Sequence, residues 1–445
     1  MKRFFLTVLA ASAAASAAGA AAPEARPVTA AAAAAGAAAQ EAQPVVPAPE
    51  SPPVVPAPEA PPVSTAPEAP PVVSGPGQPV TMFKADAART GHYPSPPPQG
   101  AGCVLWQFRT RDRVESSPVV AGGMVYVGSN GDHLYAVDAQ TGVERWRFRT
   151  DKDIASSPAV SGGMVYVGSN DDNLYAIDAQ TGVERWRFRT DKDVSTSPAV
   201  AGGLVFFGSD DKHVYAVDAA TGIQRWRFET EGKVQASPAV AGDLVYVGDT
   251  KGHFWALDAA TGVQRWGLAA DGSILAAACV AEGVVYVGDA KGNLYARDAA
   301  TGAALGRFEA DDDIRSSPAV AGGFLYVGSN DDHLYAIDVK AGCIAWKFRS
   351  GDDIRSSPAV AGGLVFVGSE DDHLYAVDAQ TGQECWRVKT GKDIHSSPAV
   401  AGGIVFIGSQ DGHLYAVGSG PAQTGVTTRP AVSDDDDDED EEGDD

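Results

Sequence analysis

Short apolar runs separated by turn residues recur along the chain every 40 residues, from Cys103 to Val417. The run Met164–Ser169 returns as Leu204–Ser209 and as Leu364–Ser369. Each copy holds four β-rich runs divided by Gly, Asp, Asn and Thr-Gly turns, and none shows the 3.6-residue apolar period of a helix. The pattern predicts four short strands in each repeat and no helix.

Four-stranded units of about 40 residues that repeat without helices are typical of a β-propeller. The innermost strand of the repeat begins eight times, at Ser116, Ser156, Thr196, Ala236, Ala276, Ser316, Ser356 and Ser396. The outermost strand also occurs eight times, but its first copy, Ala101–Arg109, precedes all the others, and the last repeat stops after its third strand near Val417. We therefore predict an all-β, eight-bladed propeller of four-stranded antiparallel blades that an N-terminal strand closes, which removes the open sheet edges.

The segment Ala136–Trp146 resembles the tryptophan-docking motif of PQQ-like (quinoprotein-type) propellers, in which PQQ is pyrroloquinoline quinone. Phe83–Gly91 is similar to the lead-in segment of such proteins, and the resemblance covers about residues 82 to 417. It implies that each motif tryptophan packs on the glycine of its own motif and on the neighbouring blade, so that Trp146 would lie on Gly142. The implied girdle consists of Trp106, Trp146, Trp186, Trp226, Trp266, Trp346 and Trp386.

The family that the chain resembles contains dehydrogenases and non-catalytic binding propellers, among them the BamB-type propeller of the outer-membrane barrel-assembly machinery. Its dehydrogenases have insertions between blades, an adjacent Cys-Cys pair, a bound Ca²⁺ and an Asp base. This chain has no adjacent cysteines and no insertions between its repeats. We therefore expect a non-enzymatic protein-binding scaffold of the cell envelope that carries no cofactor. The alternatives are a PQQ-binding redox protein or dehydrogenase, and a Ca²⁺-dependent surface adhesion or binding module.

One position of the repeat varies while its neighbours do not. Two residues before each inner-strand start every copy has Val or Ile, and the next residue changes from copy to copy, which suggests that it lines the mouth of the central channel. The candidate ligand-binding residues at this position are Glu115, Gln235, Arg315, Arg355 and His395. Guanidinium groups beside an imidazole suit an anion, and the alternative is a solvated arc of mixed charge. No catalytic residue is predicted.

Six histidines share one repeat phase, at the start of the third strand: His133, His213, His253, His333, His373 and His413. Third strands lie far from the propeller axis, and equivalent residues of neighbouring blades should be on the order of 10 Å apart, which is too far for one metal ion. We expect these histidines to cap hairpin turns and predict no metal site. A site that uses Asp and His of a single turn is the alternative.

Blades four and five depart from the repeat. Gly306 stands where the motif has tryptophan, and Arg297 replaces an aliphatic residue. The aliphatic stem of Arg297 is expected to cover the gap that the missing indole leaves. The irregularity is interpreted as sequence drift, with a groove for a partner as the alternative.

Charge and composition divide the chain into four parts. Lys and Arg total 34 against 58 for Asp and Glu, a net charge of −24, and Asp434–Asp445 contains eleven of these acidic residues. Such an acidic chain is a poor partner for nucleic acids. We predict a signal peptide at 1–20, a disordered Ala/Pro-rich spacer at 21–80, the propeller at 81–420 and a disordered acidic tail at 421–445.

The leader predicts export. The first cysteine is Cys103, so no lipid-anchor cysteine follows the leader, and no later apolar run is long enough to span a bilayer. We expect a monomeric periplasmic, secreted or cell-surface protein whose partners are proteins.

Overall fold

The structure is a computed structural model that describes residues 81–98, 100 and 102–420. The predicted signal peptide (1–20), spacer (21–80) and acidic tail (421–445) lie outside the described residues. No helix occurs in the described part of the chain, so no helix there could cross a membrane.

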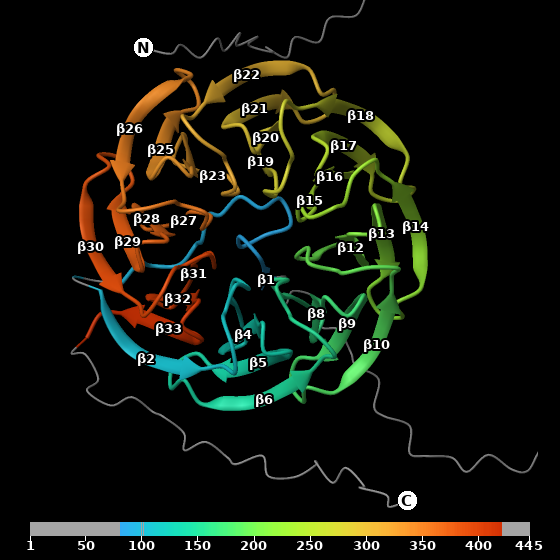
Figure 1. The fold of residues 1–445 in the computed structure, drawn as a ribbon, viewed down its shortest axis with the longest axis horizontal. Coiled ribbons are helices and arrows are strands. Elements are labelled where there is room, and N and C mark those ends of the chain that lie inside the picture. Colours follow the sequence, from blue (N-terminus) through green and yellow to red (C-terminus); the bar gives the residue numbers. More distant parts are fainter. Residues whose placement is uncertain (1–80, 99, 101, 421–445) are drawn as a thin grey trace, which may run out of the picture. The chain divides into compact units, whose positions relative to one another are not determined.

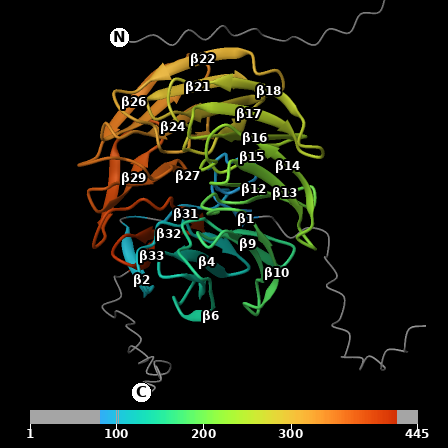
Figure 2. The ribbon, with the colours of Figure 1, turned by 45° about the vertical axis from the view of Figure 1, so that its right-hand side comes forward.

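Eight antiparallel sheets stand in a ring around a central axis, as Figures 1 and 2 show, and each forms one blade. Blade one is the sheet β3–β6, and the blades follow in chain order to blade eight. The inner strands are β3 Val119–Ala121, β7 Ala159–Ser161, β11 Ala199–Ala201, β15 Ala239–Ala241, β19 Cys279–Ala281, β23 Ala319–Ala321, β27 Ala359–Ala361 and β31 Ala399–Ala401. The second strands are β4 Met124–Ser129, β8 Met164–Gly168, β12 Leu204–Ser209, β16 Leu244–Gly248, β20 Val284–Gly288, β24 Phe324–Gly328, β28 Leu364–Gly368 and β32 Ile404–Ser409. The third strands are β5 His133–Asp138, β9 Asn173–Asp178, β13 His213–Asp218, β17 His253–Asp258, β21 Asn293–Asp298, β25 His333–Asp338, β29 His373–Asp378 and β33 His413–Gly418. The outer strands are β6 Glu144–Arg149, β10 Glu184–Arg189, β14 Gln224–Glu229, β18 Gln264–Ala269, β22 Ala304–Glu309, β26 Cys343–Arg349, β30 Glu384–Lys389 and β2 Cys103–Arg109.

An N-terminal strand completes the last blade. β2 pairs antiparallel with β33, and Trp106 stands opposite Ala416. Blade eight therefore combines β31, β32 and β33 from the end of the propeller with β2 from its beginning (Figure 1). The predicted all-β fold of eight four-stranded blades, closed by an N-terminal strand, is confirmed.

Neighbouring blades interlock through the Val or Ile that precedes the variable position. Ile154 of blade two is fully buried against Gly128 of blade one, where a Cβ would come within 2.3 Å of Ile154 Cγ2. Only glycine leaves room for this side chain. The same contact joins Val194 to Gly168, Val234 to Gly208, Ile274 to Gly248, Ile314 to Gly288, Ile354 to Gly328, Ile394 to Gly368 and Val114 to Gly408. The last of these pairs closes the ring between blades eight and one.

The girdle tryptophans bridge blades at the outer wall. The ring of Trp146 lies on Gly182 of the next blade, and its Nε1 donates a hydrogen bond to Ala179 O at 3.1 Å. The expected packing of Trp146 on Gly142 is wrong, because the indole leaves its own sheet and reaches the following blade. Gly142 is instead covered by Trp106. The remaining pairs are Trp186 with Gly222, Trp226 with Gly262, Trp266 with Gly302, Trp346 with Gly382 and Trp386 with Gly102.

The missing tryptophan at Gly306 goes together with a second substitution. In six blades an alanine such as Ala179 supplies the carbonyl that accepts the indole bond, but blade six has Val339 at this position. Val339 and Leu305 pack against the core cluster between blades five and six. Arg297 stays beside its own blade, with its guanidinium carbon 6.0 Å from the ring centre of Tyr295. The space that the missing indole leaves is therefore filled by Leu305 of blade five and by Val339 of blade six.

A belt of serine hydroxyls links the inner ends of the blades. The backbone N–H of Ser117 donates to Ser157 Oγ at 2.9 Å, and the N–H of Ser157 donates to Ser197 Oγ at 3.0 Å. The belt continues from Ser197 to Ser237, from Ala277 to Ser317, from Ser317 to Ser357, from Ser357 to Ser397 and from Ser397 to Ser117. Its one interruption in the described residues is between Ser237 and Ala277, because alanine has no hydroxyl to accept the bond.

Replacing Ala277 by serine should close this belt. The new hydroxyl would accept from the N–H of Ser237, and we expect the free energy of unfolding to rise by about 1 kcal/mol, the net value of one hydrogen bond. Urea denaturation midpoints of the wild type and Ala277→Ser measure the gain. Ala277→Val adds similar bulk without an acceptor and should not stabilise, so an equal gain in both variants would contradict the argument.

Candidate functional site at the propeller axis

The loops that join outer strands to the next inner strands share one face of the ring with the hairpins between second and third strands. We call this face the carboxylate face. Its acidic side chains hydrogen-bond to neighbouring loops and strands of the same face. In blade two, Asp171 Oδ2 accepts hydrogen bonds from the Asp151 N–H at 3.1 Å and from the Tyr175 hydroxyl at 2.7 Å. Burial, together with this bond to Asp171, raises the pKa of Tyr175. Many carboxylates of this face therefore serve the fold and are not free to bind a ligand.

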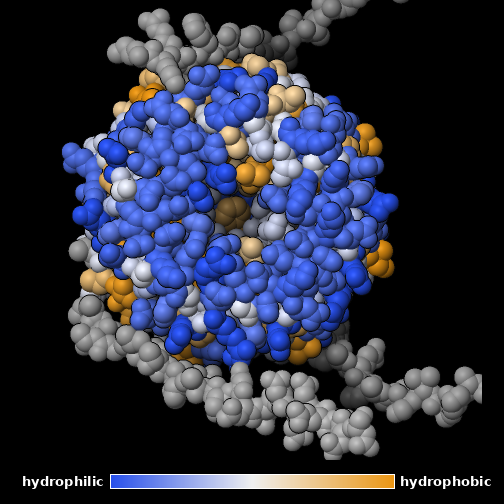
Figure 3. Space-filling model, in the orientation of Figure 1, coloured by the Kyte–Doolittle hydropathy of each residue, from blue (hydrophilic) through white to orange (hydrophobic). Residues whose placement is uncertain are grey.

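Four of the five candidate ligand-binding residues meet at the mouth of the channel. Glu115, Arg315, Arg355 and His395 line one cavity of about 170 Å³ together with Leu275. They come from blades six, seven, eight and one, whose inner strands converge on the axis. Figure 3 shows a central hollow in a largely hydrophilic face of the ring.

The charges at this mouth are already paired. Arg355 Nε and His395 Nε2 each lie 2.9 Å from Glu370 Oε1, and Arg315 lies 3.3 Å from Asp313. A guanidinium that faces a carboxylate attracts an added anion less strongly than a free one. The mouth therefore presents paired positive and negative side chains, as in the alternative of a solvated surface of mixed charge. Anion binding at this site remains a prediction.

Gln235 does not join the other four candidates. Its amide Nε2 lies 3.1 Å from Asp210 Oδ1, and Asp210 also binds Lys233 Nζ at 2.6 Å. Gln235 therefore does not line the mouth cavity, and a local carboxylate engages its side chain. Asp210 and Glu370 occupy the same phase of the repeat, and that phase also varies along the chain: Asn130, Asn170, Asp210, Thr250, Ala290, Asn330, Glu370 and Gln410. This second variable position is the signal that would have identified the partners of the mouth residues.

Two groups of potential metal ligands occur in the described residues. Ligating atoms of Glu370, Asp393 and His395 lie within 4.8 Å of one another. Since Glu370 also faces the Arg355 guanidinium, part of its charge is already neutralised. A second group, consisting of Asp332, Asp352 and Asp353, holds only carboxylates, and burial raises the pKa of Asp353.

The histidines of the third strands take part in hairpin turns. His373 Nδ1 lies 2.7 Å from Asp371 O, and His333 Nδ1 lies 2.6 Å from Asp331 O. In blade two, Asn173 takes the histidine position and its Nδ2 donates to Asp171 O at 2.9 Å. These contacts are the expected turn caps.

The lead-in segment, residues 81–98, binds the inner strands around the axis. β1 (Thr81–Met82) pairs antiparallel with β7 of blade two. Beyond it, Ala87 O accepts from the Val240 N–H of blade four at 2.6 Å, and Ala88 O accepts from the Val280 N–H of blade five at 2.9 Å. The carbonyls of Thr90 and Gly91 repeat this contact with blades six and seven. One short segment thus hydrogen-bonds to the axial ends of successive blades.

Two buried cations extend these contacts. The Arg89 guanidinium is fully buried and donates to the carbonyls of Phe83, Ser197, Pro198 and Pro238, at distances of 2.8 to 3.0 Å. Lys84 Nζ donates to Ser317 O at 2.7 Å and to Pro318 O. Sequence reasoning missed both roles, because the lead-in occurs once and no internal comparison marks its charged residues as buried.

The pH dependence of stability should report the burial of Lys84. Burial lowers the pKa of Lys84 from 10.5 to about 7, while Cys279 and Asp86 act in the opposite direction. Between these two pH values the unfolded chain binds a proton that the folded chain releases, so the unfolding free energy gains up to about 1.4 kcal/mol per pH unit as pH rises.

The Lys84→Met variant is the control for this effect. We expect urea midpoints of the wild type to rise relative to those of Lys84→Met between pH 7 and about pH 9.5. Parallel pH profiles of the two proteins would contradict the assignment.

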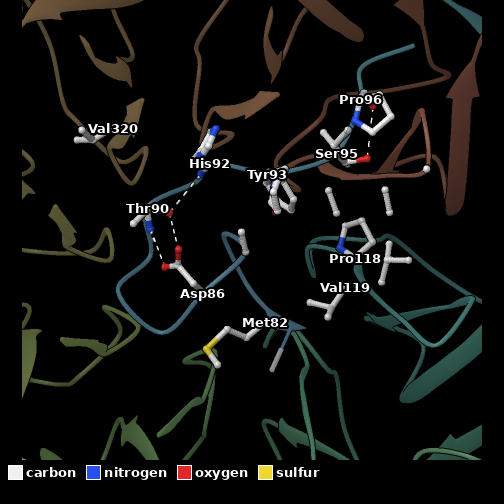
Figure 4. A pocket seen from close by; sticks show the side chains of 17 residues that line it. Met82, Asp86, Thr90, His92, Tyr93, Ser95, Pro96, Pro118, Val119 and Val320 are labelled. Carbon is white, nitrogen blue, oxygen red and sulfur yellow. Dashed lines mark hydrogen bonds between the residues drawn. The ribbon is translucent and has the colours of Figure 1, made fainter. Parts of the chain in front are cut away.

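A second cavity lies on the other side of the lead-in, with a volume of about 760 Å³. Figure 4 shows that His92 and Tyr93 of the lead-in lie across it from Pro118 and Val119 of blade one. Most of its lining is apolar. Its one carboxylate, that of Asp86, accepts hydrogen bonds from the N–H and the hydroxyl of Thr90 at 3.0 and 2.5 Å (Figure 4).

The residues of these two cavities do not fit a Ca²⁺–quinone centre. Ca²⁺ takes six to eight oxygen ligands, whereas the mouth cavity offers one carboxylate, Glu115, and serine hydroxyls such as Ser157 that already accept bonds of the belt. In the larger cavity Asp86 is engaged by Thr90. The four cysteines are separate free thiols, and Cys279 is buried.

Several solved structures share this fold. BamB from Moraxella catarrhalis is 19% identical, with a TM-score of 0.64 over 72% of this chain and 100% of that one. The quinohemoprotein alcohol dehydrogenase from Comamonas testosteroni is 17% identical, with a TM-score of 0.67 over 77% of this chain and 81% of that one. The computationally designed protein Ika8 is 17% identical, with a TM-score of 0.65 over 71% and 99% of the two chains. At such identities the likeness shows the fold alone.

Sequence comparison goes further than the fold. No curated protein sequence matches the chain. A family model described as "Outer membrane protein assembly factor BamB" matches four overlapping segments, 98–196, 182–305, 271–356 and 342–425. Together the segments run from 98 to 425 and cover most of the chain, including every blade. The chain therefore belongs to the BamB-like family of PQQ-repeat propellers.

Proposed function

We propose that the protein is a non-enzymatic scaffold of the cell envelope that binds protein partners through its rigid propeller. The observation that carries the proposal is the axis itself, where the lead-in binds successive inner strands and leaves a mouth cavity of about 170 Å³. Small-molecule pockets typically have about 300–1,000 Å³, so the mouth cavity is smaller than usual. The larger cavity, of about 760 Å³, is within this range, but its lining is mostly apolar and its one carboxylate, Asp86, is engaged by Thr90. Membership of the BamB-like family supports the same function and an envelope location.

The groove formed by the larger cavity is the surface best suited to a partner. Its lining combines Pro96, Pro118, Val119, Val120 and Val400, which present apolar surface beside the backbone of the lead-in. An apolar groove with polar groups at its rim is typical of protein interaction sites. We propose that a partner inserts apolar side chains here.

Site-specific cross-linking in the cell tests this proposal. A photo-activated amino acid at His92, which is exposed and lines the groove, should trap an envelope protein that mass spectrometry can identify. The same amino acid at Val183, which is 56% exposed in the turn before β10 and does not line the groove, is the matched control. A partner trapped equally at both positions, or at neither, would refute docking in the groove.

A quinone-dependent enzyme is the competing function, and one experiment separates the two. The purified protein mixed with PQQ and Ca²⁺ should show no quinone absorption band and no dye reduction with alcohols or sugars. Dye reduction would refute the scaffold proposal. A rise in melting temperature with Ca²⁺ alone would instead favour the Ca²⁺-dependent binding module.

A further inference from the structure

The outer wall of the propeller is basic although the chain is strongly acidic. On β6 the exposed positions alternate with the girdle and carry Arg145, Arg147 and Arg149, and β10 repeats this pattern. Some of these charges are compensated within the strand and its turn. Arg145 lies 2.7 Å from Asp138, and its hydrogen bond holds the pKa of that carboxyl down at about 2.

Other arginines of the wall have no ion-pair partner in the described part of the chain. Arg109, Arg149 and Arg189 end the outer strands of blades eight, one and two, and Arg227 lies within the outer strand of blade three; all four are exposed. We call these four residues the arginine arc. Arg147 stands beside the arc, with Glu144 3.9 Å away.

Blades six and seven differ at the same repeat position. Arg349 of blade six lies 3.3 Å from Asp332, and Lys389 of blade seven lies 3.9 Å from Asp372. Asp132 is the equivalent carboxylate beside Arg149, but no ion pair joins the two. Arginines without an ion-pair partner are therefore concentrated on consecutive blades of the described wall. Lys347 of blade six has no ion-pair partner either, but its Nζ lies 4.6 Å from the ring centre of Tyr335.

The chain leaves the propeller on blade eight, one strand length from Arg109, since β2 pairs Cys103 with Gly418 and Arg109 with His413. A Cβ on Gly420 would lie 3.7 Å from the Leu105 side chain on β2. The neighbouring Trp106 donates its Nε1 hydrogen bond to Ala139 of blade one, at 3.2 Å, and covers Gly142, two residues before β6 begins. Residue 420 thus lies where blades eight and one meet.

The acidic run Asp434–Asp445 begins 14 residues after Gly420 and contains eleven carboxylates. Fourteen residues can span up to about 45–50 Å, more than twice the length of a six-residue strand of about 20 Å. We propose that Asp434–Asp445 docks on the arginine arc of its own chain, where carboxylates and exposed guanidinium groups pair. This docking is independent of the partner groove, which lies at the axis.

Arginine footprinting of the full-length protein tests the docking. Phenylglyoxal modification, followed by mass spectrometry, is compared with a variant whose eleven acidic residues in Asp434–Asp445 become Asn or Gln. At low salt we expect Arg149 and Arg189 to react about threefold faster, or more, in this variant, and the difference to vanish near 0.5 M NaCl, where charges are screened beyond a few ångströms. Arg349 and Arg387, which lie on blades six and seven and have carboxylate partners, are internal controls and should react equally in both proteins.

A second variant tests the arc directly. Arg149→Gln with Arg189→Gln should release the tail, so that a glutamate-specific protease removes it faster than from the wild type. Arg349→Gln with Arg387→Gln is the matched control and should leave the cleavage rate unchanged. Equal footprints in wild type and tail variant would overturn the proposal. So would protection that persists without the acidic groups and grows with protein concentration, since it would assign the arc to a second copy of the chain.

Discussion

Replacing Trp106 by alanine is expected to lower the free energy of unfolding by about 3–5 kcal/mol, the usual cost of removing a buried tryptophan. The indole is 6% exposed, covers Gly142 and donates a hydrogen bond to Ala139 O. It also holds the one outer strand that no hairpin connects to its blade. Urea denaturation measures the loss of stability.

Hydrogen exchange should reveal where the Trp106→Ala protein opens. We expect the amides of β2 and β33 to exchange before the other blades, since losing β2 opens the ring locally. Trp226→Ala is the matched control, because Trp226 is 8% exposed and makes the same contacts with Ala259 and Gly262. Strand β14, which carries Trp226, is joined to β13 by a hairpin. In Trp226→Ala the amides of β14 should therefore exchange at the same time as those of the other blades. Identical exchange maps for the two variants would contradict the closing role of β2.

Replacing Arg89 by methionine should cost about 3–5 kcal/mol, because it leaves four buried carbonyls without their donor while the aliphatic volume is kept. The guanidinium joins blades three and four to the lead-in. Burial lowers its pKa to about 9, so it is charged at neutral pH. The loss is measured by urea denaturation.

Arg89→Lys separates charge from geometry. A single ammonium group keeps the charge but cannot reach four carbonyls at once, so this variant should be intermediate between wild type and Arg89→Met. In both variants protease should cut the lead-in faster than in the wild type. Wild-type stability in Arg89→Met would contradict a structural role for the lead-in.

The repeat made the ring predictable because each strand, turn and blade boundary was seen eight times at one spacing. The displaced first copy, Ala101–Arg109, was sufficient to predict closure. The resemblance implied that Trp146 packs on Gly142, whereas it lies on Gly182. The repeat could not correct this expectation, because it does not reveal which of two equivalent copies makes a contact. The position of a residue within the repeat can be read from the sequence, whereas the residue that it contacts depends on how neighbouring blades pack against each other.

Only those site residues that occupy an equivalent position in every repeat could be predicted from the sequence. Variation at one phase placed Glu115, Arg315, Arg355 and His395 at the mouth. It could not anticipate that Asp210 would engage Gln235, because that contact depends on a second phase varying in the same blade. Lys84 and Arg89 belong to no repeat, and charged residues in a loop are expected in solvent unless the fold supplies partners.

The hydrogen bonds of the serine belt all run the same way around the ring, and they are interrupted at one blade boundary of the described residues. Every bond of the belt runs from the N–H of one blade to the hydroxyl of the following blade, and the sequence of bonds stops between blades four and five. One blade boundary further along, Gly306 replaces the girdle tryptophan. The boundary between blades four and five thus lacks the belt hydrogen bond, and the boundary between blades five and six lacks the indole hydrogen bond. Both lie about half a turn around the ring from blade eight, which β2 closes. Mechanical or thermal stress should therefore separate the ring first around blade five, where the chain is continuous, and leave the non-covalent pairing of β2 with β33 intact.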